Sequence, residues 1–218
     1  MRRVSQICVL SMLVSGFSGE VRGEVRYSHH DFSSQGWSGG ELCVTCHTPH
    51  NANTTQSDAP LWNHQITIAS YTVYTSSTMN AAPGQPNGVS KLCLSCHDGT
   101  VAIDSFGTRV GTRYAQFGRI GTDLAPHHPI SFTYDSSLAA VDGELRDPAS
   151  TPSGLGSTIA NDLLRGGQLE CTSCHDVHVE RNNSGCTGCH TVHPMSTKTL
   201  SLRKSNDGSA LCLTCHAK

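Results

Sequence analysis

The sequence predicts a single, mostly irregular domain with short helices and a few short strands. Three observations predict it. Only 15% of the residues are charged and 36% are hydrophobic, while glycine occurs 21 times. Segments 51–60 and 80–90 are rich in Asn, Gly, Pro and Ser, a composition typical of turns. No segment shows the long amphipathic periodicity of a helix bundle, and no linker divides the chain into separate domains.

A chain of this composition has little aliphatic material with which to offset the entropy lost on ordering. Something other than side chains is therefore expected to supply the core. The few regular elements we predict are short. Alternation of apolar and polar residues over 71–75 and 130–134 predicts two strands. Segment 157–165 predicts a short helix, with Ser157 or Thr158 as its N-cap.

The N-terminal segment, residues 1–23, is predicted to be a secretory signal peptide. Two arginines precede a short apolar run at 7–17, and small residues follow it. The run is too short to span a bilayer, which takes roughly 20 apolar residues; a buried N-terminal helix is the alternative. Cleavage after Gly23, with Ser18 as a competing site, leaves one domain over 24–218. We expect that domain to be secreted into the periplasm or outside the cell.

Ten of the 11 cysteines belong to one pattern, C-x-x-C-H, which occurs five times; the remaining one, Cys8, lies in the predicted signal peptide. The five copies, motifs one to five, are Cys43/Cys46/His47, Cys93/Cys96/His97, Cys171/Cys174/His175, Cys186/Cys189/His190 and Cys212/Cys215/His216. The pattern is typical of c-type haem attachment. Both cysteines add to the haem vinyl groups as thioethers, and the histidine becomes the proximal iron ligand. We expect each motif on a short helical turn, and five covalently attached haems as the missing core.

C-x-x-C pairs also occur in two other kinds of site. Zinc ribbons use such pairs, and so do redox dithiols of the thioredoxin type. Neither explains a histidine directly after the second cysteine in all five copies, and an odd number of pairs suits four-cysteine zinc sites badly. Proteins that bind nucleic acids carry a basic patch. The formal net charge of −2, to which the haem propionates add further negative charge, therefore argues against a nucleic-acid partner.

The remaining histidines indicate how the irons are ligated. The chain has 13 histidines, and removing the five proximal ones leaves His29, His30, His50, His64, His127, His128, His178 and His193. Outside the signal peptide, only Met79 and Met195 could provide the methionine ligation that raises a haem potential. Bis-histidine ligation of all five haems is the economical assignment. Six-coordinate iron has no open position for a substrate, so we expect electron transfer and not an enzyme.

Some of these histidines carry further signals. His50, His178 and His193 each follow a proximal histidine by three positions. A residue so placed cannot reach the far face of the haem its neighbour holds, but it can reach the iron of a haem stacked alongside. The repeated spacing therefore predicts close haem pairs; three surface histidines are the alternative. In each adjacent pair, 29/30 and 127/128, one member is expected to bind iron. His64 is either a ligand or a loop residue packed by Trp62.

Longer phrases resemble a known group of proteins. They are CHTPHNA at 46–52, KLCLSCHDGTVAIDSFG at 91–107, GTDL and HPISFTY within 121–134, and CTSCHDVH at 171–178. These look like the doubled C-x-x-C-H multihaem cytochromes, most closely the small extracellular tetrahaem cytochromes that polymerise into conductive filaments in metal-reducing bacteria. The resemblance covers nearly the whole mature chain, as far as GSALCLTCHAK at 208–218.

The resemblance implies a set of distal ligands. His30, His50, His128 and His178 would complete the haems on motifs one, two, three and five. The chain departs from the pattern at SGCTGCHTVHP, 184–194, which looks like an inserted fifth haem with its own ligand, His193.

We therefore expect an extracellular or periplasmic electron conduit, with other redox proteins as donor and acceptor. A homopolymer is expected in which one axial histidine is shared between subunits. His30 is the favoured shared residue because it lies near the predicted cleavage site on a polar segment, where chain ends are mobile unless tied down; folding back onto its own chain is the alternative. A discrete shuttle is a second possibility. A pentahaem nitrite reductase is a third, but the C-x-x-C-K motif of those enzymes does not occur.

Overall fold

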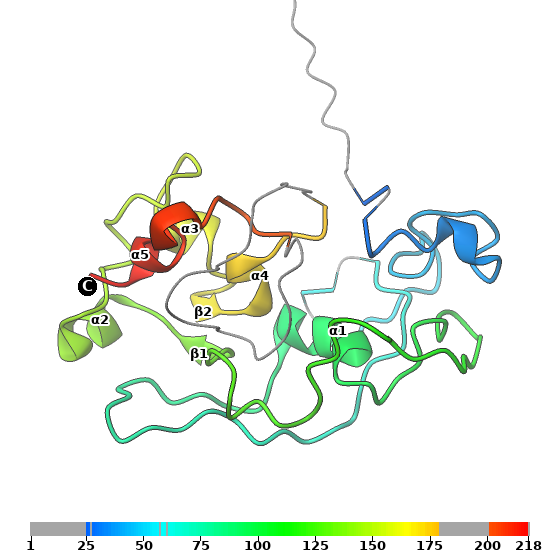
Figure 1. Ribbon diagram of the computed structural model, residues 1–218, viewed down its shortest axis with the longest axis horizontal. Helices are drawn as coiled ribbons and strands as arrows, with labels where there is room; N and C mark the ends of the chain where they lie inside the picture. Colours follow the sequence, from blue (N-terminus) through cyan, green and yellow to red (C-terminus); the bar gives the residue numbers. More distant parts are fainter. Residues whose placement is uncertain (1–24, 27, 57, 60, 179–200, 218) are drawn as a thin grey trace, which may run out of the picture.

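The computed structural model describes residues 25–26, 28–56, 58–59, 61–178 and 201–217, most of which lie in turns and loops (Figure 1). The helices are α1 (Gly88–His97), α2 (Ser136–Asp142), α3 (Ile159–Asp162), α4 (Cys171–Cys174) and α5 (Cys212–Cys215), with 3-10 turns η1 (Ser33–Gln35) and η2 (Asp207–Ser209). The strands β1 (Phe132–Thr133) and β2 (Gln168–Leu169) pair antiparallel, with Phe132 opposite Leu169. The predicted fold class, mostly irregular with short helices and strands, is confirmed.

Some predictions fall outside the described residues. They are the signal peptide at 1–23 and motif four, with Cys186, Cys189, His190 and the candidate ligand His193. Of the helices within the described ranges, none is both long enough and apolar enough to cross a membrane.

The short elements predicted between the motifs are found in part. Strand β1 lies within the predicted segment 130–134, and α3 within 157–165. Thr158 is the N-cap of α3, since its hydroxyl accepts a hydrogen bond from the Asn161 backbone N–H. The strand predicted at 71–75 is wrong, because that segment forms no more than one isolated bridge among the described residues. The side chain of Gln85 bonds both the N–H and the carbonyl of Tyr71, at 2.8 Å each, where a neighbouring strand would otherwise bond.

Two small apolar clusters form the side-chain core. The larger joins β1, β2, α2 and α3 through Phe132, Tyr134, Ala139, Ile159, Leu163, Leu164 and Leu169. The smaller contains Tyr71, Leu94 and Leu124. The two clusters hold ten buried residues within the described ranges, which is modest for a chain of this length, as the composition predicts.

Helices α1 and α4 pack against each other and bring two haem motifs together. A buried polar group, Glu170, lies at this contact. Its carboxylate accepts a hydrogen bond from the Ser131 hydroxyl at 3.2 Å, and it forms a reciprocal capping box with Ser173 at the start of α4. The Cys171 N–H donates to the Ser90 hydroxyl of α1 at 2.9 Å. These bonds fix motif three against the helix that carries motif two.

Candidate haem-binding site

Each of the four described motifs forms one helical turn, which brings its histidine back over its own cysteines. Motif two closes α1, and motifs three and five form α4 and α5. In motif one, the His47 N–H donates to the Cys43 carbonyl at 2.8 Å, the i to i−4 bond of a helix. The same bond joins His175 to Cys171 at 3.0 Å and His216 to Cys212 at 2.9 Å. The short turns expected from the motif are therefore present.

The cysteines of neighbouring motifs lie close together. The thiols of Cys93 and Cys171, the first cysteines of motifs two and three, are hydrogen-bonded to each other. Cys46 of motif one is near enough to Cys96 of motif two to affect its titration. Motifs one, two and three thus form a contiguous group of attachment points.

Burial affects the chemistry of these thiols. It raises the pKa of Cys46 to about 11, of Cys96 to about 12 and of Cys215 to about 11. Cys171 is the exception, because its hydrogen bond with Cys93 lowers its pKa and outweighs burial. Within the described ranges, no three His, Cys, Asp or Glu side chains are grouped to hold a metal ion.

Three proximal histidines face a second imidazole from a distant part of the chain. The ring centroids are 6.2 Å apart for His47 and His178, 5.9 Å for His97 and His30, and 6.3 Å for His216 and His128. Metal–imidazole nitrogen bonds are about 2 Å long, so two rings on opposite faces of one iron have their centroids about 6 Å apart once the ring radii are added. All three pairs have the spacing of axial ligands.

Hydrogen bonds hold two of these rings by Nδ1, which leaves Nε2 for a metal. His97 Nδ1 lies 2.7 Å from the Gly118 carbonyl, and His128 Nδ1 lies 2.9 Å from the Pro129 carbonyl. His178 Nδ1 lies 3.4 Å from a carboxylate oxygen of Asp176. Burial, followed by the nearby His97, lowers the pKa of His30 to about 4. Its ring is therefore neutral at pH 7, the form that coordinates iron.

His64 shows the opposite arrangement. Its Nδ1 is 2.7 Å from the Gln65 carbonyl and its Nε2 is 3.0 Å from the Ala102 carbonyl, so each nitrogen lies beside a backbone oxygen, and the neutral ring donates to one of the two. Its side chain is buried beside Cys96, with Nε2 at 3.6 Å from the sulfur. Of the two interpretations of His64, a packed loop residue is the one that the structure supports.

His30 is folded back onto its own chain, which is the alternative to its being shared with a neighbouring protomer. Its ring lies opposite His97 of its own chain. The segment that carries it is anchored by aromatic side chains, since Phe32 packs on Trp37 at 5.3 Å and Trp37 on Phe106 at 5.9 Å. These contacts hold the segment in place, although its polar composition predicts a mobile chain end.

The remaining described candidate, His50, lies at the surface. Within the described residues, its imidazole has no hydrogen bond, ion pair or ring contact. It lines an open cavity of about 550 Å³ together with Asn53, Phe106 and Arg109. Its sequence neighbour in the motif, His47, faces His178 instead.

Buried polar atoms near the motifs fit a large acidic cofactor. Four donors are buried and have no hydrogen-bond partner among the described residues: the indole N–H groups of Trp37 and Trp62 and the hydroxyls of Thr45 and Thr172. Thr45 and Thr172 lie inside motifs one and three, and Trp62 packs edge-on to His47 at 6.0 Å. Buried donors require acceptors, and haem propionates are acceptors of the right charge. A narrow apolar cavity of about 40 Å³ that includes Leu94, Leu124 and Ile130 adjoins Cys171.

Two contacts were missed by the sequence reasoning. The Gly118 carbonyl, which orients His97, has no signal in the sequence, since any residue supplies a carbonyl. Trp62 was linked to His64, and its ring centroid is indeed 6.4 Å from that ring, but its shorter contact is with the proximal His47.

The motifs and the imidazole pairs together define a protein that attaches several c-type haems. Residues 179–218, 40 of the 218, match the family described as the doubled CXXCH motif. This motif indicates covalently bound c-type haem, and it supports a place for the chain among multihaem c-type cytochromes. None of the curated proteins matches the chain.

Proposed function

We propose that this protein transfers electrons, outside the cell or in the periplasm, through five closely placed bis-histidine c-type haems, and that it polymerises. The observation that carries the proposal is the set of three imidazole pairs with centroids 5.9 to 6.3 Å apart, each containing a C-x-x-C-H histidine. Ligands on both faces leave no position for a substrate, so the proposal is an electron carrier and not an enzyme.

The chain's own residues determine how such a carrier behaves. Each haem supplies an iron that gains or loses one electron. The paired imidazoles keep that iron six-coordinate, and backbone carbonyls at Gly118 and Pro129 hold two of the rings in place. The contact between Cys93 and Cys171 puts the attachment points of two haems side by side, which supports short steps between them.

Polymerisation is the second part of the proposal. An axial histidine shared between subunits must be exposed and must not already face an iron of its own chain. His30 does not meet this requirement, since it lies opposite His97. His50 is exposed, and it follows His47 by three positions in a C-x-x-C-H-x-x-H phrase. At this spacing it cannot reach the far face of the haem that His47 would hold. We therefore assign the shared ligand to His50.

Electron counting on the full-length mature protein tests the carrier function. Reductive titration should take up five electrons per chain. The reduced protein should not bind carbon monoxide, because every iron already has six ligands. A high-spin fraction that binds carbon monoxide and turns over nitrite would contradict the proposal and favour a reductase.

Replacement of His50 tests the polymer. Electron microscopy of the secreted wild-type protein should show filaments, and His50→Ala should abolish them while all five haems stay attached. His29→Ala is the matched control, since His29 is an exposed histidine beside an assigned ligand, and it should leave the filaments intact. Filaments formed equally well by His50→Ala would show that the shared ligand is a different residue.

A discrete shuttle is the second candidate function. The observation that favours it is the position of His30, because a ligand retained by its own chain creates no link between subunits. A protein that accepts five electrons and remains monomeric at all concentrations would establish the shuttle in place of the polymer.

A further inference from the structure

Two surfaces of opposite charge lie near opposite ends of the molecule. The first, the basic surface, is segment 108–119, which contains Arg109, Arg113 and Arg119 and no acidic residue, a net charge of +3. The second, the acidic surface, consists of segment 135–147 and α5. Segment 135–147 contains four carboxylates and one arginine, a net charge of −3. Figure 1 shows α2 and α5 at one end of the long axis and the segment after α1 toward the other.

The basic surface exposes large apolar side chains on a rigid support. Phe117 is 85% exposed, Val110 is 81% exposed and Tyr114 is 45% exposed. Interface residues that contribute most to binding are enriched in aromatic side chains and arginine. Within the described residues, neither Arg113 nor Arg119 has an ion pair, so both guanidinium groups can meet carboxylates of a partner.

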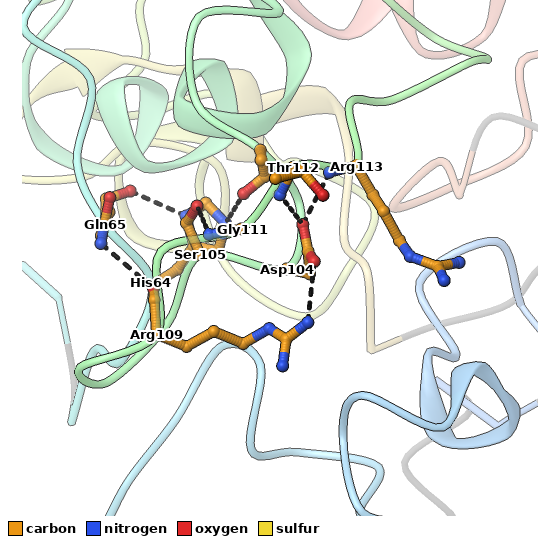
Figure 2. Close-up of polar contacts among 9 residues, drawn as sticks. His64, Gln65, Asp104, Ser105, Arg109, Gly111, Thr112 and Arg113 are labelled. Atoms are coloured by element: carbon orange, nitrogen blue, oxygen red, sulfur yellow. Dashed lines mark hydrogen bonds and ion pairs between the residues drawn. The ribbon is translucent and has the colours of Figure 1, made fainter.

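The support itself is a hydrogen-bonded loop (Figure 2). The buried carboxylate of Asp104 accepts from the N–H groups of Thr112 at 2.9 Å and Arg113 at 2.8 Å, and from the Arg109 guanidinium at 3.2 Å. The Ser105 hydroxyl accepts from the Gly111 N–H at 2.9 Å. A loop fixed in this way loses little conformational entropy when a partner binds, which strengthens binding.

The acidic surface offers a complementary apolar centre. Val141, on α2, is 74% exposed, and Leu213, on α5, is 39% exposed. The Arg146 guanidinium donates to the Leu213 carbonyl at 3.0 Å, and the Ala217 N–H donates to the Glu144 carbonyl at 2.7 Å, so segment 135–147 and α5 form one surface.

Building on the polymer proposed above, we infer that the basic surface of one copy of this chain docks on the acidic surface of the next. The occupant of each surface is a second copy of the chain. The two surfaces differ, so the contact is head-to-tail and extends into a filament wherever the rotation does not close a ring. The basic surface adjoins the proximal ligand His97 through Gly118, and the acidic surface adjoins His216 through Leu145. The contact therefore brings motif two of one copy toward motif five of the next.

Charge reversal on the holoprotein tests the contact. The variant Arg113→Glu/Arg119→Glu carries acidic charge on both surfaces, and Asp142→Lys/Glu144→Lys carries basic charge on both. Like charges placed together oppose association. Each variant alone should raise the concentration needed for assembly by about tenfold or more, measured by light scattering and electron microscopy. An equimolar mixture should assemble again as an alternating copolymer, a result that damage to folding would not produce.

Salt and an exposed control residue complete the test. Wild-type assembly should weaken in about 1 M salt, where charges are screened beyond about 3 Å. Ile68→Ser, which changes a side chain 98% exposed outside both surfaces, should assemble like wild type. Variants that assemble normally, or a mixture that stays monomeric, would overturn the docking inference and leave electron transfer standing. A wild-type protein that never assembles would overturn the docking inference together with the polymer.

Discussion

The two ends of the molecule hold their haem motifs by different physical means. Near motif five, an aliphatic cluster supports the fold, with Ile159 fully buried and the Tyr134 hydroxyl donating to the Arg146 carbonyl at 2.6 Å. Near motif two, the loop that follows α1 is organised around the buried carboxylate of Asp104 (Figure 2), and the smaller cluster of Tyr71, Leu94 and Leu124 lies beside it. The first end depends chiefly on packing, whereas the loop after α1 at the other end depends on charge-assisted hydrogen bonds. They should therefore respond differently to truncation and to pH.

Truncation at the packed end should have the largest effect on stability. Ile159→Ala removes a fully buried side chain and leaves a cavity, which should lower the free energy of unfolding by about 2–5 kcal/mol. Chemical denaturation of the holoprotein measures this change. Ile68→Ala deletes the same atoms from a side chain that is 98% exposed, and it should change stability by less than about 0.5 kcal/mol. Equal losses from both variants would show that the cluster does not support this end.

Removal of the carboxylate should destabilise the other end nearly as much. Asp104→Ala leaves two backbone N–H groups without their acceptor, at a cost of about 2–3 kcal/mol at pH 7. Asp123→Ala, at an exposed aspartate with one described local hydrogen bond, is the matched control.

The pH dependence of the same end follows from the titration of Asp104. Burial raises the pKa of this carboxyl, but hydrogen bonds from Arg113, Arg109 and Thr112 outweigh burial and hold the pKa below its usual 3.8. A lowered pKa means that the stabilisation is present above about pH 3.8 and is lost as pH falls through the lower value. The native protein should therefore approach the stability of Asp104→Asn in acid. A constant difference between the two from neutral pH into acid would contradict this account.

A single added methyl group should disturb the same loop by a smaller amount. A Cβ at Gly111 would lie 2.2 Å from Asp104 Oδ1 and 2.6 Å from the backbone carbon of Asp104, closer than packed atoms allow. Gly111→Ala should cost about 1–3 kcal/mol through the shift it forces. Gly84→Ala is the control, because its Cβ would meet nothing closer than 4.0 Å. Thermal unfolding followed at the haem absorption band compares the two.

The smallest effect concerns the contact between α1 and α4. Burial raises the pKa of Glu170 above its usual 4.5, against the hydrogen bonds it accepts from Ser90 and Ser131. A raised pKa means that its contribution is complete below pH 4.5 and is lost as pH rises through the higher value. Denaturation at several pH values should show that loss in the native protein and not in Glu170→Gln. Glu41→Gln, at an exposed position, should keep the native pH profile.

What the sequence could predict was local. The C-x-x-C-H spacing determines a helical turn within five residues, and the composition indicates a small core, so the motifs and the irregular fold were predicted correctly. Helix α2 was missed although its signals are present: the Asp135 carboxylate accepts from the Leu138 N–H at 2.8 Å, and Gly143 ends the helix with φ of 74°. A search for caps alone would have found it.

The pairing of imidazoles could not be predicted, because it joins residues far apart in the chain. His30 and His97 are 67 positions apart, and the segment that carries His30 is held by the aromatic contacts of Trp37 with Phe32 and Phe106. The hydrogen bonds accepted by Asp104 could not be predicted from the sequence either. Its partners are backbone N–H groups, which every residue except proline carries.

The central claim is that His30, His178 and His128 are the distal ligands of the haems held by His97, His47 and His216. Iron positions in a high-resolution structure of the haem-loaded protein, located by anomalous diffraction or electron cryo-microscopy, test it most directly. The account predicts one iron between the two rings of each pair, bonded to a nitrogen of both. An iron on His47 whose other axial ligand is any residue except His178, or the equivalent at His97 or His216, would contradict it.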